Sequence, residues 1–163
     1  MGGPGSNCGV LAGERTCENS GMLVIDAKAR TALRRHGEEA YPEESCGVLA
    51  GRFGDGGGVA VSAIPCDNLR RDSPRNRYAI DPKELIRIQQ EIRKQGLEIV
   101  GFYHSHPDHP AQWSSTDLAE AHWVGCSYVI TQVAAGAAAE TKSFRLEGSW
   151  DEKRFVEEEI VQP

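Results

Sequence analysis

The sequence is organised around one stretch, Gly101-Phe-Tyr-His104-Ser-His106-Pro-Asp-His-Pro-Ala-Gln-Trp-Ser114-Ser-Thr-Asp117. It directly follows the mostly apolar residues 97–100, which predict a buried strand. His104 and His106 are two positions apart, so an extended backbone points both side chains to the same face of a sheet. Asp117 follows eleven residues after His106. Two imidazoles and a carboxylate placed after a buried strand predict a metal site.

The ligand types favour a catalytic zinc site. Two nitrogens and one carboxylate oxygen leave a tetrahedral zinc with one open position for water. Zinc lowers the pKa of that water toward neutrality and polarises a substrate carbonyl. A general base must then come from elsewhere, and Glu44, just before a short strand over residues 46–51, is the candidate. Ser114 is the candidate donor to a developing oxyanion.

Each of these residues also has a simpler structural explanation. Ser114 and Asp117 have the spacing of a helix capping box. Glu44 taken alone is typical of a solvated acid, and His109 of a polar surface residue. The combination of a His-x-His pair and a downstream aspartate after a buried strand favours the metal site.

The combined pattern Glu44 … His104-Ser-His106-Pro-x6-Ser114-x-x-Asp117 resembles the signature of the JAMM (MPN-plus) zinc metalloproteases at every position. The segment Pro42-Glu-Glu44-Ser-Cys-Gly47 is similar to the family's Pro-x-Glu-x-x-Gly motif, which selects Glu44 over Glu43. The resemblance extends over residues 22–161. The His-Ser-His-Pro-Asp-His-Pro run is most similar to small stand-alone bacterial members. Trp113 stands where we expect a proline in that subgroup, which leaves the detail of the substrate groove open.

The resemblance implies both a fold and a set of residue roles. The fold is an α/β (α+β) one, a mixed curved sheet sandwiched by two or three helices and related in shape to cytidine deaminases. His104, His106 and Asp117 would bind one zinc ion per chain. Glu44 would be the acid/base, and Ser114 would stabilise the tetrahedral intermediate. Family members hydrolyse peptide or isopeptide bonds after the C-terminal Gly-Gly of ubiquitin-like, β-grasp proteins.

Three substrate classes follow from the resemblance: a sulfur-carrier protein with a C-terminal extension or adduct, a ubiquitin-like conjugate, and an unrelated peptide. We favour the sulfur carrier, because the segments around the site are too short for the insertions of specialised deubiquitinases. A non-catalytic MPN scaffold is disfavoured by the intact ligand set. A zinc nucleoside deaminase would need Pro-Cys-x-x-Cys, and Pro65-Cys-Asp-Asn-Leu69 lacks the second cysteine.

Composition narrows the class of protein further. The length of 163 residues argues for one domain. The net charge of −6 argues against nucleic acid as a partner. No apolar run has the length of a membrane span. Five cysteines lack C-x-x-C spacing and no secretion signal precedes them. We therefore expect free thiols, either small buried side chains or surface thiols, in a protein of the reducing cytoplasm. The oligomeric state stays open, a dimer included.

The remaining sequence predicts the domain boundaries and elements. We expect a flexible N-terminal tail over residues 1–21, in which residues 8–13 repeat residues 46–51 letter for letter, and a catalytic domain over residues 22–163. Strands are predicted at residues 22–25, 46–51, 59–64, 97–103, 127–133, 141–146 and 154–161, the last also being compatible with a helix. Helices are predicted from Asp26 to a fading end at residues 37–42, from Asp81 to Gly96, and over residues 115–124, with a loop at 104–113.

Overall fold

The computed structural model describes residues 21–70, 72 and 77–163. The predicted tail and its repeated segment lie outside these residues, apart from Gly21. In chain order the elements are β1 (Met22–Ile25), α1 (Ala27–Ala40), β2 (Cys46–Gly54), β3 (Gly57–Cys66), α2 (Pro82–Lys94), β4 (Glu98–Pro107), α3 (Ser115–Glu120), β5 (Ser127–Ala134), β6 (Ala137–Gly148) and β7 (Lys153–Val161).

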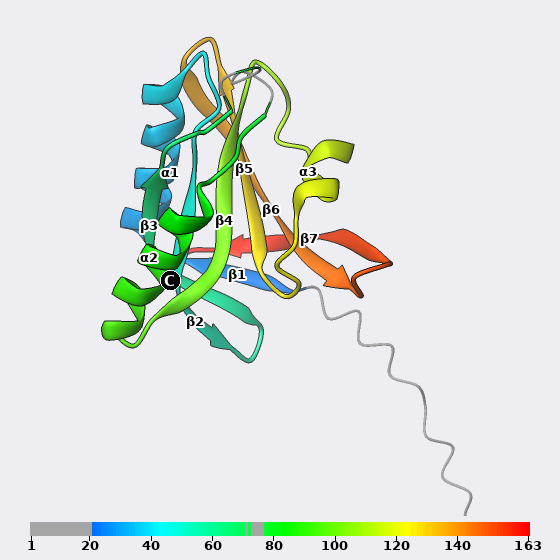
Figure 1. Ribbon diagram of the computed structural model, residues 1–163. Helices are drawn as coiled ribbons and strands as arrows, with labels where there is room; N and C mark the ends of the chain where they lie inside the picture. Colours follow the sequence, from blue (N-terminus) through cyan, green and yellow to red (C-terminus); the bar gives the residue numbers. More distant parts are fainter. Residues whose placement is uncertain (1–20, 71, 73–76) are drawn as a thin grey trace, which may run out of the picture.

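The sheet is mixed and strongly curved. Its strand order is β1-β3-β2-β4-β5-β6-β7, and it closes into a barrel because β1 also pairs with β7 (Figure 1). The pairs β1–β3, β1–β7 and β4–β5 are parallel, and the others are antiparallel. The predicted mixed sheet is confirmed, and closure through the short β1 is a feature that the sequence pattern did not reveal.

The two longer helices cover opposite sides of the sheet. On α1, Ala29 and Leu33 pack with apolar side chains of β1 to β5. On α2, Ile88 and Ile92 pack with a different cluster that includes Phe102 of β4. This confirms the predicted sheet between helices. Apolar residues at spacings of three and four give each helix the buried stripe that it needs.

The helix starts follow the predicted caps. Asp26 accepts a hydrogen bond from the Lys28 N–H, and Asp81 accepts one from the Lys83 N–H, with Pro82 in the first helical turn. Helix α1 ends at Ala40, within the predicted fading range of residues 37–42 and two residues before Pro42. The buried Gly37 within the helix does not stop it.

Two element boundaries close to the predicted site differ from the sequence prediction. Strand β4 runs to Pro107, so His104 and His106 lie in the strand and not in a loop, because β5 pairs with it over this whole length. Helix α3 ends at Glu120, because Ala121 is extended with ψ 124°. The last segment is a strand, as favoured over a helix, because it pairs with both β6 and β1.

The described cysteines are free thiols, as predicted, and they are buried. Cys46, Cys66 and Cys126 are all in the core. Burial raises the pKa of Cys66 and of Cys126 to about 12. Thiols in this state behave as small apolar side chains. None of the helices within the described residues is long and apolar enough to cross a membrane.

Candidate active site

Glu44 reaches the histidine pair through the pairing of β2 with β4. The strands are antiparallel, and Cys46 lies opposite His104. The same register continued by two residues puts Glu44 opposite His106. Ser45 secures this continuation, because its N–H donates to the Ser105 hydroxyl at 2.8 Å and its carbonyl accepts from the Ser105 N–H at 3.1 Å. A residue sixty positions earlier is thereby held beside the histidines.

The four residues predicted around the metal lie together. The Nε2 atoms of His104 and His106 are 3.1 Å apart. The Asp117 carboxylate faces both rings, with Oδ1 3.4 Å from His104 Nε2 and Oδ2 3.3 Å from His106 Nε2. Ligand atoms of Glu44, His104 and His106 all lie within 4.8 Å of one another. The donors therefore converge on one point, from β4, from α3 and from the segment before β2.

The environment gives the predicted ligands the protonation states that bind a cation. Burial lowers the pKa of His104 and keeps its imidazole neutral. Burial alone would raise the pKa of Asp117, but hydrogen bonds with His104 and His106 outweigh it and hold that pKa well below its usual range. Neutral imidazole and ionised carboxylate are the forms that coordinate metals. The residues therefore fit a zinc ion.

Glu44 is a buried acid with a perturbed pKa. Burial, and then repulsion from Asp117 and Glu120, raise its pKa to about 9. Its Oε2 atom is buried and makes no hydrogen bond within the described part of the chain. Strongly shifted acids in a cleft are candidates for acid–base catalysis. The simpler explanation of Glu44 as a solvated surface acid is wrong.

Two contacts orient the histidine rings. The His106 Nδ1–H group donates a hydrogen bond to the Pro110 carbonyl at 2.9 Å, which leaves Nε2 free to coordinate a metal. The ring of Tyr78 stacks on that of His104 with centroids 4.5 Å apart. Sequence reasoning missed Tyr78, whose only signal was a short apolar piece ahead of α2.

Ser114 forms the capping box that its spacing to Asp117 predicted, and it also lies beside the predicted site. It caps α3, because its hydroxyl oxygen accepts from the Asp117 N–H at 3.1 Å while its own N–H donates to Asp117 Oδ2 at 2.9 Å. It also lines a cavity with Glu44 and His106. Since accepting a hydrogen bond does not use the hydroxyl proton, Ser114 can still donate one into that cavity.

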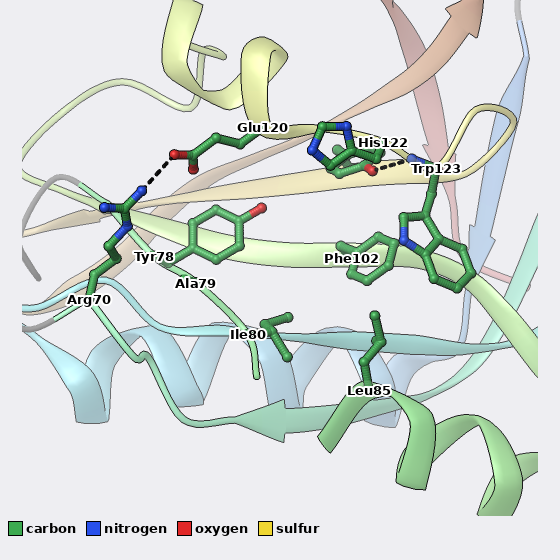
Figure 2. A pocket seen from close by; sticks show the side chains of 10 residues that line it. Arg70, Tyr78, Ala79, Ile80, Leu85, Phe102, Glu120, His122 and Trp123 are labelled. Carbon is green, nitrogen blue, oxygen red and sulfur yellow. Dashed lines mark hydrogen bonds and ion pairs between the residues drawn. The ribbon is translucent and has the colours of Figure 1, made fainter. Parts of the chain in front are cut away.

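Two cavities lie near the histidine pair: His106 lines one of them, and Tyr78, which stacks on His104, lines the other. The first, here named the aromatic cavity, measures about 270 Å³ and is drawn in Figure 2. Its walls are Arg70, Tyr78, Ala79, Ile80, Leu85, Phe102, Glu120, His122, Trp123 and Tyr128. The second, here named the loop cavity, measures about 250 Å³ and is lined by Glu44, His106, Pro107, His109, Pro110, Gln112 and Ser114. The loop cavity therefore borders the predicted site directly, and the aromatic cavity adjoins it through the Tyr78 ring.

Trp113, the departure from the expected subgroup pattern, packs into the body of the protein. Its ring lies 5.7 Å from that of Phe155 on β7. It also packs against a small core cluster of Ala111, Ile130 and Phe144. The tryptophan anchors the segment between His106 and Ser114.

Fold and site together define a JAB/MPN-type α+β protein. The chain belongs to the family described as prokaryotic homologs of the JAB domain, whose model matches residues 26–147. The resemblance to the JAMM family is thereby confirmed.

Relatives with this fold act as peptidases. The chain is 39% identical to the desampylase of Haloferax volcanii, over 68% of this chain and 81% of that protein. It is 31% identical to the CysO-cysteine peptidase of Mycobacterium tuberculosis, over 77% and 83%. A solved structure from Desulfitobacterium hafniense is similar with a TM-score of 0.74 and 30% identity, over 87% of this chain and 93% of that one.

Proposed function

We propose that this protein is a zinc metallopeptidase that hydrolyses the peptide or isopeptide bond after the C-terminal Gly-Gly of a ubiquitin-like, β-grasp protein, with a sulfur-carrier protein as its substrate. The observation that carries the proposal is the convergence of His104, His106 and Asp117 beside a buried Glu44. Relatives named for a CysO–cysteine adduct and for TtuB–protein conjugates support the substrate class.

Zinc would be held by His104, His106 and Asp117. When bound, it supplies an acidified water and polarises the scissile carbonyl. Glu44 takes a proton from the attacking water and passes it to the departing amine. The Ser114 hydroxyl donates to the oxygen of the tetrahedral intermediate.

From the two cavities we propose a direction for the substrate. The loop cavity contains Glu44, the proposed proton donor, so it receives the departing amine. The aromatic cavity then receives the carrier tail, with Tyr78 at the end nearest His104 and Trp123 toward the other end (Figure 2). Glycines before the scissile bond let the substrate backbone pass closely by the Tyr78 ring.

The experiment is a cleavage assay combined with metal analysis. A β-grasp protein that ends in Gly-Gly plus a short extension, and the same protein joined to a lysine side chain, are offered to the purified chain. We expect one bound zinc per chain and release of the Gly-Gly end, both lost in His104→Ala. Stoichiometric zinc without cleavage of either substrate would contradict the proposal and favour a non-catalytic scaffold. Preferred cleavage of the lysine conjugate would favour the alternative, a deubiquitinase-like isopeptidase.

A further inference from the structure

Asp108 holds the loop that follows β4 by its side chain and its backbone. Its Oδ2 accepts a hydrogen bond from the Tyr41 hydroxyl at 2.7 Å, just beyond the end of α1. Its Oδ1 accepts from the Ala135 N–H at 2.8 Å, in the turn between β5 and β6. The Asp108 N–H donates to the Val133 carbonyl at 2.8 Å. One residue therefore ties this loop to two separate parts of the fold.

The backbone of Asp108 adopts a conformation that needs such support. Its φ is 56°, in the left-handed region, which costs a non-glycine residue free energy. Aspartate tolerates this region better than most residues because its short side chain can bond locally. Here the carboxylate bonds instead to residues far away in sequence, so tertiary contacts keep the loop in this shape.

The loop that Asp108 holds carries two functional features. Pro110 accepts the hydrogen bond from His106 Nδ1 that leaves Nε2 pointing at His104 and Asp117. Pro107, His109 and Pro110 also line the loop cavity beside Glu44. A shift of this loop would change the angle of one imidazole and the shape of the cavity together.

We propose that Asp108 is a positioning residue that sets the orientation of His106 and the wall of the loop cavity. The role rests on the proposed function, since it acts on a metal ligand and on the proposed place of the departing amine. Asp108 is not a catalytic residue, because its two carboxylate oxygens are bonded to Tyr41 and Ala135.

Three substitutions in the full chain separate the contributions. Tyr41→Phe removes one bond to the carboxylate and leaves Asp108 in place. Asp108→Asn keeps the size of the side chain and an oxygen for the Ala135 N–H. Asp108→Gly removes the whole side chain but relieves the left-handed backbone. Asp26→Asn, at the start of α1 and also bonded to a backbone N–H, is the matched control.

The readouts are zinc affinity by chelator competition, the visible spectrum of the cobalt(II)-substituted protein, and melting of the metal-free protein. For Asp108→Gly we expect zinc binding to weaken by about tenfold or more, as for residues that orient metal ligands, with a changed cobalt spectrum. Tyr41→Phe and Asp108→Asn should show smaller changes in the same direction. Asp26→Asn should leave both metal readouts unchanged and the melting temperature close to wild type, because asparagine caps a helix about as well as aspartate.

An unchanged zinc affinity and cobalt spectrum in Asp108→Gly, with only a lower melting temperature, would overturn the positioning role. Both metal readouts are independent of turnover. If the protein cleaves no Gly-Gly substrate, the proposed function fails while the orientation of His106 is still tested. Where turnover is measurable, kcat should fall by a larger factor than KM rises, because the tail-binding cavity is untouched.

Discussion

At the residue scale, substitution of Glu44 should separate catalysis from metal binding. We predict that Glu44→Gln abolishes turnover while zinc stays bound, because Glu44 is assigned as the base and the ligands are His104, His106 and Asp117. The loss in kcat should be about 100-fold or more, as expected for removal of a general base. The exposed neighbour Glu43 provides the control Glu43→Gln. Zinc loss in the Glu44 variant, or unimpaired cleavage, would contradict the assignment.

The raised pKa of Glu44 also predicts how the stability of the metal-free protein depends on pH. The carboxyl has a pKa of 4.5 as its ordinary value and about 9 when folded. Between these two pKa values Glu44 is protonated in the folded state and ionised in the unfolded state. The stability that the protonated carboxyl contributes is therefore lost as pH rises toward the folded pKa. Urea unfolding of the metal-free protein should show wild type losing stability relative to Glu44→Gln as pH is raised through neutrality. An unchanged difference between the two would contradict the shift.

Residue-level prediction from the sequence identified the residues of the proposed site but not the residues that position them. His104, His106, Asp117 and Glu44 are close together as expected, because a two-residue spacing on a strand fixes which face the histidines share. Tyr78 and Asp108 could not be predicted. Their roles arise from contacts with residues distant in sequence, and no local sequence pattern around either residue predicts such contacts.

At the element scale, the close approach of β2 to its neighbours determines where Glu44 lies. A Cβ atom on Gly47 would overlap the Tyr103 ring and the Ile64 carbonyl. We predict that Gly47→Ala lowers the free energy of unfolding by about 1–3 kcal/mol, the range for overpacking, and reduces kcat because the segment before β2 is displaced. Gly54→Ala, whose added atom would meet the Val59 side chain only at 3.7 Å, is the control. Equal effects of the two substitutions on kcat would contradict this link.

Elements with a clear hydrophobic period were predicted in the right place, but some of their ends were not. Leu85, Ile88 and Ile92 mark the buried side of α2, which was found where expected. The end of β4 was predicted at Tyr103, four residues before its end at Pro107, because polar residues usually signal a loop. The pairing of His104 with Ile130 and of His106 with Gln132 on β5 extends the strand instead. Tertiary pairing outweighed local composition.

At the scale of the whole molecule, a buried ion pair connects the strands beside the barrel closure. Glu158 on β7 lies 3.0 Å from Arg145 on β6, with its side chain 1% exposed. Glu158 also accepts hydrogen bonds from Ser127 and Ser143, and Arg145 donates to the Gly56 carbonyl at 2.9 Å. The network thus joins β5, β6 and β7 to the β2–β3 turn. The contact of Arg145 with the β2–β3 turn depends on the closed sheet, so the sequence pattern did not predict it.

Breaking this network should cost stability without changing the chemistry of the site. Arg145→Ala leaves the Glu158 carboxylate buried and unpaired, for which we expect a loss of about 3–5 kcal/mol in the free energy of unfolding. Arg154→Ala, which breaks a pair whose arginine is 68% exposed, should cost no more than about 1 kcal/mol. Urea unfolding with zinc bound measures both. Zinc stoichiometry and kcat of the folded fraction should match wild type, because Glu44 and the ligands are held through β2, β4 and α3 and not through this pair. A small stability loss in Arg145→Ala would mean that water reaches Glu158 and that pairing of β1 with β3 and β7 suffices to close the barrel.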